Sequence, residues 1–111
     1  AAHFDVTFAF IVFHELPLRI IEATVREAAR VTRPGGLFAV YDFNETRSMS
    51  PFQLYHRDFD AGHNGEPYSQ DFCDCDFDAI LERRGFRVAA QPLAKRAGGA
   101  GYMKHWFATR V

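Results

Sequence analysis

The sequence has few cysteines and no excess of charge of either sign. Among its 111 residues only Cys73 and Cys75 are cysteines, and 13 basic side chains stand against 14 acidic ones. Two cysteines this close together cannot build a disulfide framework, which fits a reducing compartment. A net charge of -1, without any basic cluster, argues against a nucleic-acid partner, because polynucleotide binding requires a positive surface.

The chain also lacks a long apolar run and a targeting segment. No stretch reaches the roughly 20 apolar residues of a membrane span, and the first residues lack the basic and then apolar order of a secretory signal. We therefore expect a cytoplasmic protein without a membrane partner. Its length allows one domain at most, with a core that needs no metal or disulfide. The chain lacks an initiator methionine and enters an apolar stretch within three residues, as if it had been cut from something longer.

Phenylalanine is abundant, with 12 residues, and many of them stand in predicted strands. Residues 4–13 form an almost unbroken apolar and β-branched run, which predicts a central parallel strand covered on both faces. Apolar residues at helical spacing predict a helix over about 17–32, which Pro34 and two glycines end. A second apolar strand over 37–43 completes a βαβ unit with parallel strands.

The middle of the chain, residues 44–69, is polar and contains several prolines and glycines that break regular structure. We predict one short helix there, around 51–59. A connection of this length within a compact domain is usually functional or mobile. The segment combines tyrosine, histidine and acidic side chains, which suit proton transfer or metal binding, but without regular ligand spacing we expect no metal site.

The end of the chain predicts a helix followed by a hairpin. Asp74 or Asp76 can cap a helix that runs to Arg84, and Gly85 is placed to end it. Strands over 87–93 and 102–111, joined by a glycine-rich turn, predict an antiparallel hairpin. The order of elements is therefore β-α-β-(loop)-α-β-β.

Five motifs in this order carry a resemblance to a known family. They are Phe4-Asp5-Val6, Val12-Phe13-His14-Glu15-Leu16, Arg26-Glu27-Ala28-Ala29-Arg30-Val31, Arg33-Pro34-Gly35-Gly36-Leu37 running into Asp42, and Leu81-Glu82-Arg83-Arg84-Gly85-Phe86. With them the chain resembles the C-terminal half of the class I S-adenosylmethionine-dependent methyltransferases, of the type 11 and type 12 kind. The resemblance covers nearly the whole chain except residues 44–69, and it implies an α/β, Rossmann-like sheet that ends in an antiparallel hairpin.

Two cofactor-binding features of this family are missing. The family holds S-adenosylmethionine with a glycine-rich loop after the first strand and an acidic residue at the end of the second, and neither is present here. The glycines at 98–101 lie in the predicted hairpin and cannot replace that loop. The resemblance thus implies that residues 1–111 are one partial domain, which lacks the N-terminal cofactor-binding half and is not active alone.

The resemblance also implies which residues surround the reaction. Phe10 and Ile11 would flank the cofactor, and His14 would face the methyl group or the substrate as a base. A second interpretation of His14, as a helix-entry residue bonded to the backbone, has equal weight. Asp42 either touches the substrate or caps the turn after its strand, and the second interpretation is favoured. Asp5 is expected to be structural.

Residues 44–69 would form a substrate-side loop or lid, because the family builds its specificity there. Asn44, Tyr55 and His56 are the substrate contacts that we expect, and the acceptor would be a small organic molecule.

Three hypotheses remain open. In the first, the chain is the substrate-side half of a methyltransferase and works only with its missing half. In the second, it is a non-catalytic module that dimerises through its exposed strand edge. In the third, it belongs to another doubly wound nucleotide enzyme, such as a dehydrogenase.

Overall fold

The computed structural model describes residues 2–43, 46, 49–63, 67–89 and 103–111. Its elements follow in chain order. They are β1 (Phe4–Phe10), η1 (Phe13–Glu15), α1 (Leu18–Val31), β2 (Thr32–Phe43), α2 (Pro51–His63), α3 (Ser69–Asp74), α4 (Phe77–Arg83), β3 (Phe86–Val88) and β4 (Met103–Arg110).

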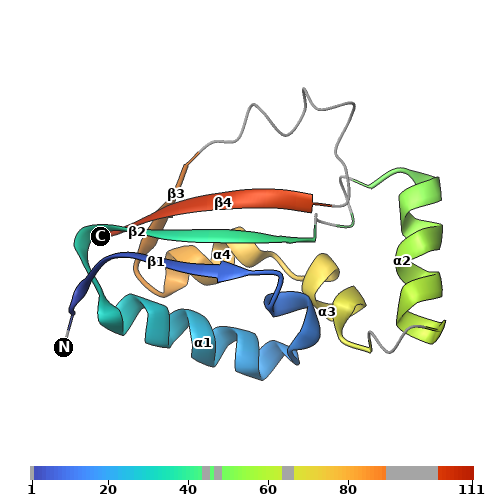
Figure 1. Cartoon of the computed structure of the whole chain (residues 1–111), viewed down its shortest axis with the longest axis horizontal. Coiled ribbons are helices and arrows are strands. Elements are labelled where there is room, and N and C mark those ends of the chain that lie inside the picture. Colours follow the sequence, from blue (N-terminus) through green and yellow to red (C-terminus); the bar gives the residue numbers. More distant parts are fainter. Residues whose placement is uncertain (1, 44–45, 47–48, 64–66, 90–102) are drawn as a thin grey trace.

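The four strands form one mixed sheet in the order β1-β2-β4-β3 (Figure 1). β1 and β2 are parallel, whereas β4 is antiparallel to both of its neighbours, β2 and β3. The predicted parallel pair and the predicted antiparallel pair at the end of the chain are therefore confirmed. The glycine-rich turn between the last two strands lies outside the described residues.

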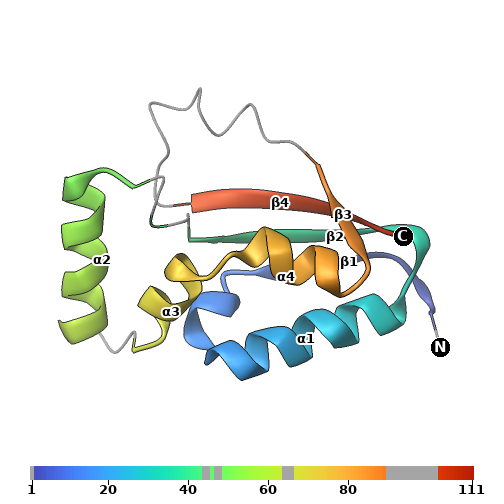
Figure 2. The same cartoon turned by 180° about the vertical axis from the view of Figure 1, so that it is seen from behind.

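Helices α1, α3 and α4 all lie against one face of this sheet, as Figures 1 and 2 show from opposite sides. Their apolar side chains meet the alternate residues Phe38 and Val40 of β2 and Trp106 and Ala108 of β4, all of them buried. The single tryptophan, Trp106, is 1% exposed, and its indole N–H donates to Asp78 at 2.7 Å. The core thus lies on the helix side of the sheet.

The opposite face of the sheet is open, and it corrects one prediction. β1 ends at Phe10 and forms an edge of the described sheet, so the expectation of a central strand over 4–13 that is covered on both faces was wrong. Val6, Phe8 and Phe10 are 58%, 77% and 61% exposed. The run is apolar on both faces, but the helices that the structure describes cover only one of them.

The passage from α1 to β2 also differs from the prediction. The helix ends at Val31, before Pro34, because Thr32 already pairs with Phe4 in the sheet. The Thr32 hydroxyl donates to the carbonyl of Ala28 at 2.7 Å, which satisfies one of the last helical acceptors. The register between β1 and β2 then shifts, and the Pro-Gly-Gly sequence lies within β2.

The helices after β2 agree only in part with the prediction. The predicted short helix is present as α2, which extends to His63, and α3 was not predicted at all. α4 begins as expected, because the Asp76 carboxylate accepts the N–H of Ala79 at 3.1 Å. Gly85 follows the helix with a φ of 98°, the left-handed conformation that glycine adopts at little cost.

Candidate functional site

The candidate site lies where the two parallel strands end. β1 and β2 run side by side up to the pair Phe10 and Tyr41, so the carboxyl ends of the two strands lie next to each other. In open parallel sheets, ligands bind at the carboxyl ends of the strands. η1 follows β1 directly and α3 packs against it, so both elements enclose the same corner (Figure 1).

His14 and Asp42 form a buried pair at this corner. His14 Nδ1 lies 2.8 Å from Asp42 Oδ1, and the two residues are 3% and 0% exposed. The ring of Phe43 stacks on the imidazole with 4.1 Å between ring centres, which fixes the plane of the ring. In the tautomer that donates from Nδ1 to the Asp42 carboxylate, Nε2 is the basic nitrogen of the ring.

Asp42 also binds the backbone of the segment after β1. Its Oδ2 accepts the N–H groups of Val12 at 3.1 Å and Phe13 at 2.7 Å, and its Oδ1 accepts the N–H of Phe43 at 2.8 Å. It therefore holds the first N–H groups of η1, the donors that a helix start leaves without intrahelical partners. The turn that Asp42 was predicted to cap lies outside the described residues, and most of the contacts of Asp42 reach back across 28 to 30 residues.

Ile11 has a conformation that no local sequence pattern predicts. Its φ is 54°, in the left-handed region, where a β-branched residue is an outlier. Its N–H donates to the carbonyl of Tyr41 at 2.7 Å, so the strained residue continues the ladder at the very end of β1. Backbone strain of this kind concentrates at functional sites. Phe10, just before it, keeps an exposed ring that contacts the ring of Tyr41.

Besides Asp42, the candidate substrate residues lie on α2 or outside the described residues. Tyr55 is 64% exposed, and the ring of the half-buried His56 packs against those of Phe52 and Tyr55. Asn44 lies outside the described residues. α2 stands at the carboxyl end of the sheet (Figure 1) and is joined to α3 by a 2.8 Å hydrogen bond from Gln70 to Asp58. The structure thus brings His14 and Asp42 together, whereas the rings of Tyr55 and His56 pack against each other on α2.

Neither a metal cluster nor a membrane-spanning helix is found in the described part of the chain. No group of three or more histidine, cysteine, aspartate or glutamate side chains is arranged to hold a metal ion there. No helix in these residues is both long enough and apolar enough to cross a membrane.

Comparison with known proteins identifies the fold. No protein-family profile matches the chain, and no curated protein sequence matches it. Among solved structures, the crystal structure of the aminoglycoside resistance methyltransferase NpmB1 is similar, with a TM-score of 0.54 and 15% sequence identity. The match covers 96% of this chain and 52% of that one, so the chain spans about half the length of the structure it matches. The chain has a mixed α/β, methyltransferase-like fold.

Proposed function

We propose that the chain takes part in S-adenosylmethionine-dependent methyl transfer to a small organic acceptor and supplies the substrate-side half of the domain. One observation carries the proposal: a buried histidine–aspartate pair at the carboxyl ends of two parallel strands, in a fold similar to that of a methyltransferase. We further propose that residues 44–69 act as a lid and that the reaction takes place in the cytoplasm.

The residues at the end of β1 fit one flank of the cofactor. Phe10 offers an exposed aromatic ring, and the left-handed backbone at Ile11 turns the chain sharply beside it. An apolar wall next to a strand end suits the nucleoside part of such a ligand. The glycine-rich loop and the acidic residue that would hold the rest of it are absent from the sequence, so these two residues alone give an incomplete site.

His14 is the base that we propose. S-adenosylmethionine, when bound, supplies an activated methyl group on a sulfonium, so the protein mainly has to align the acceptor and remove its proton. In our proposal Nδ1 donates to Asp42, which lies 2.8 Å away, and Nε2 is the atom that would accept the proton of the acceptor's hydroxyl or amine group. The proton would pass to His14 Nε2 as the acceptor formed its bond to the methyl carbon, and the bond from that carbon to sulfur would break to leave a neutral thioether.

Access to His14 requires that its surroundings move. The residue is 3% exposed, and both α3 and β2 pack against η1. We propose that α3 shifts together with the segment that precedes it, so that Tyr55, His56 and Asn44 come to contact the acceptor.

The first experiment asks which cofactor the protein binds. S-adenosylmethionine is titrated by calorimetry into the 111-residue chain and into the product of its complete reading frame. We expect binding heat only with the longer product, because this chain carries one flank of the site. Binding of a nicotinamide dinucleotide instead of S-adenosylmethionine would remove the methyltransferase assignment.

The second experiment tests the histidine. Methyl transfer to a panel of small phenols, amines and carboxylic acids is measured for the wild type and for His14→Asn. Loss of a general base should lower kcat roughly 100- to 10,000-fold, while the Kd for S-adenosylmethionine stays within about twofold. The matched control is His3→Asn, an exposed histidine at the opposite end of β1. Equal losses in both variants would contradict the proposal.

Asp42 is a positioning residue in this scheme. Asp42→Asn should lower kcat and change the pH profile of kcat, and its effect should not add to that of His14→Asn in the double variant, since the two act as one unit. Additive effects with an unchanged pH profile would leave Asp42 only a structural role.

A second candidate function is a non-catalytic module that dimerises through β1. The observation in its favour is that β1 forms an edge of the described sheet and exposes large apolar side chains.

A further inference from the structure

Phe43 directly follows Asp42, and its side chain contacts the candidate base. The ring of Phe43 stacks on the imidazole of His14 with 4.1 Å between ring centres and 28° between ring planes. At this separation the faces of the two rings are in van der Waals contact. The exposed His105 has a looser arrangement, since Phe107 lies 6.0 Å from it and Tyr41 meets it edge-on. The buried histidine therefore has the closer ring against its face.

A hydrogen bond at Nδ1 does not by itself fix the orientation of an imidazole. The contact with Asp42 Oδ1, at 2.8 Å, sets the position of one ring nitrogen of His14. The ring can still tilt about this contact, and a tilt moves Nε2, which lies on the far side of the ring. The last side-chain torsion of histidine has broad minima, so packing has to select the plane.

Phe43 supplies this packing from the end of β2. Its backbone N–H donates to Asp42 Oδ1 at 2.8 Å, so one carboxylate oxygen binds both the imidazole and the backbone of the residue that stacks on it. The side chain of Phe43 is half-buried and packs against the core, and the residue pairs with Met103 of β4. The core and the neighbouring strand thus hold the ring that contacts His14.

The backbone of His14 is anchored separately. Phe13 is 0% exposed, and its ring contacts three phenylalanine rings, one each from β2, α3 and α4. The N–H groups of Phe13 and His14 donate to Asp42 Oδ2 at 2.7 Å and 3.4 Å. Because the backbone is held in this way, the side-chain torsions are the main freedom left to His14.

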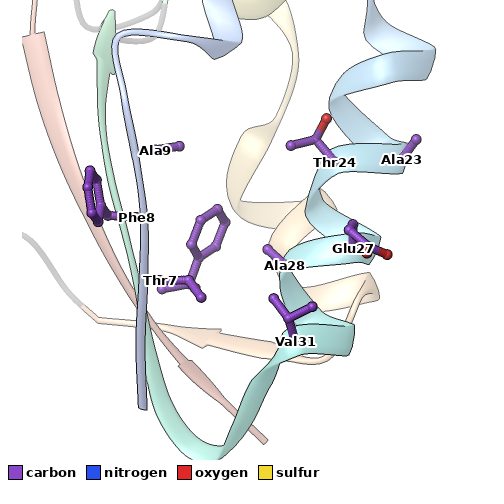
Figure 3. A pocket seen from close by; sticks show the side chains of 9 residues that line it. Thr7, Phe8, Ala9, Ala23, Thr24, Glu27, Ala28 and Val31 are labelled. Carbon is purple, nitrogen blue, oxygen red and sulfur yellow. The ribbon is translucent and has the colours of Figure 1, made fainter. Parts of the chain in front are cut away.

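The groove beside β1 takes no part in this arrangement. It encloses about 400 Å³ between β1 and α1, and Thr7 and Ala9 point from the strand towards the helix there (Figure 3). Its lining includes none of His14, Asp42 and Phe43. The stacking contact therefore belongs to the corner at the end of β2 and not to the groove.

We propose that Phe43 is a positioning residue for His14, whose stacked ring holds the imidazole plane so that Nε2 keeps one direction in the site. The inference deepens the proposed function and rests on it for the role of His14 as a base. Phe43 takes up and releases no proton, and it acts only through the orientation of His14.

An aromatic ring suits this role better than an aliphatic side chain. A flat ring lies along the whole face of the imidazole, whereas leucine touches it with two methyl groups and leaves it room to tilt. The negative face of the aromatic ring also favours the imidazolium that forms when Nε2 takes up a proton. Tyrosine keeps the flat ring, so Phe43→Tyr and Phe43→Leu separate stacking from the filling of space.

Nuclear magnetic relaxation measures the restriction of the ring. The histidine rings of the protein are labelled with carbon-13, and the order parameter of the Cε1–H bond of His14 is determined. We expect about 0.85, typical of rigid structure, in the wild type and in Phe43→Tyr, and less than about 0.6 in Phe43→Leu. An imidazole that stays equally rigid in Phe43→Leu would overturn the proposal. Phe43→Met repeats the comparison with a flexible side chain, so the outcome does not depend on whether the leucine variant folds.

The matched control is Phe107→Leu. This substitution removes a ring that lies parallel to the imidazole of the exposed His105, and it should leave the order parameter of His14 unchanged. An equal loss of order at His14 in Phe107→Leu and Phe43→Leu would mean that a general loosening of the sheet frees the imidazole, and the stack would have no positioning role.

Kinetics test the consequence for the reaction. With an acceptor that the wild type methylates, Phe43→Leu should lower kcat roughly 10- to 100-fold, because Nε2 is misdirected. KM should stay within about twofold, since Phe43 does not touch the acceptor. Phe43→Tyr should recover most of the lost kcat. A lower Tm with unchanged kcat in Phe43→Leu would leave Phe43 only a structural role.

The two measurements distinguish this proposal from the proposed function. Loss of order at His14 in Phe43→Leu, in a protein that transfers no methyl group, would support the positioning of the ring and remove the proposed function. Methyl transfer that requires His14 and is unaffected by Phe43→Leu would do the reverse.

Discussion

At the scale of single residues, Asp42 joins the end of β2 to the segment after β1. Asp42→Asn places an amide NH2 group where backbone N–H groups need an acceptor, in a site that is 0% exposed. We expect the free energy of unfolding to fall by about 2–4 kcal/mol, as measured by urea denaturation with the fluorescence of Trp106.

The control for this prediction is Asp5→Asn. The Asp5 side chain is 81% exposed and forms a 3.3 Å ion pair with Arg33, so its loss should cost less than about 0.5 kcal/mol. A similar cost for the two variants would mean that the contacts of Asp42 do not stabilise the fold.

A second prediction concerns the backbone strain at Ile11. It can be measured by comparing the free energy of unfolding of an Ile11 variant with that of a Val12 variant. Ile11 and Val12 are both β-branched, and they are 37% and 40% exposed, but φ is 54° at Ile11 and −120° at Val12. Asparagine tolerates the left-handed region. Ile11→Asn should therefore cost roughly 1–2 kcal/mol less than Val12→Asn. Equal free energies of unfolding in the two variants would show that Ile11 stores no strain.

The sequence predicted these site residues singly but not their arrangement. The resemblance implied His14 as a base or a helix-entry residue and Asp42 as a substrate contact or a turn cap, and neither was predicted as the partner of the other. The bonds from Asp42 to Val12 and Phe13 depend on the exact path of the chain after Phe10, which no local pattern encodes. The left-handed Ile11 is set by that same tertiary context, since its own side chain opposes the conformation.

At the scale of elements, the two glycines at the start of β2 have different roles. Gly36 is enclosed: a Cβ atom there would lie 2.8 Å from the carbonyl oxygen of Asp5 and 2.9 Å from that of Arg33. Gly35 has a φ of 83° and open space around it. Gly36→Ala forces backbone to move and should cost about 2–3 kcal/mol, whereas Gly35→Ala should cost about 1 kcal/mol from its conformation alone.

Urea denaturation of both variants checks this order. The register shift between β1 and β2 depends on the close approach at Gly36, so a larger loss in Gly35→Ala would contradict the description of this turn.

A pair on α1 predicts a small dependence of stability on pH. The Arg30 side chain donates to Glu27 at 2.9 Å, and this hydrogen bond holds the pKa of the Glu27 carboxyl below its ordinary value of 4.5. Because the pKa of Glu27 is lower in the folded than in the unfolded protein, its charge stabilises the fold above pH 4.5. This stabilisation is lost as the pH falls through the pKa of the folded protein. Glu27→Gln should therefore lower the urea midpoint at neutral pH, and the difference from wild type should vanish at strongly acidic pH, below the folded pKa.

The control for the pH prediction is the same substitution in an Arg30→Met background. Without the guanidinium, Glu27→Gln should change the urea midpoint only slightly, at neutral and at acidic pH alike. A difference between glutamate and glutamine that persists at low pH would assign the effect to packing rather than to charge.

The elements that the sequence predicted well are those with a clear periodic pattern. The helix over α1 and the last strand, β4, follow from side-chain spacing, and the structure adds that Trp106 and Ala108 face the core. α3 was missed because six residues are too few to show a helical period. The early start of β2 was missed because pairing with Phe4, rather than the proline and glycines, decides where the helix stops.

At the scale of the whole molecule, the structure is a slab of two layers. Figure 1 shows one sheet with one layer of helices on one of its faces. The one large error of the sequence prediction follows from this shape. The run at residues 4–13 has the composition of a strand covered on both faces, and the described helices supply a cover for one. The sequence pattern therefore indicated that both faces of β1 should be covered, whereas the described helices cover only one.

The slab predicts how the 111-residue chain associates with itself. Sulfate salts strengthen the burial of apolar surface, so rising ammonium sulfate should drive association through the open face of the sheet, as followed by sedimentation velocity. We call this the aromatic face, because Phe8, Phe10 and Phe107 are exposed on it. Phe8→Ser with Phe107→Ser removes two of these rings and should raise the salt concentration needed for association. Phe52→Ser removes an equally exposed ring from α2 and should leave it unchanged. If Phe52→Ser raised the salt concentration needed for association as much as the double variant does, association would depend on α2. The aromatic face would then not be the preferred contact surface of the chain.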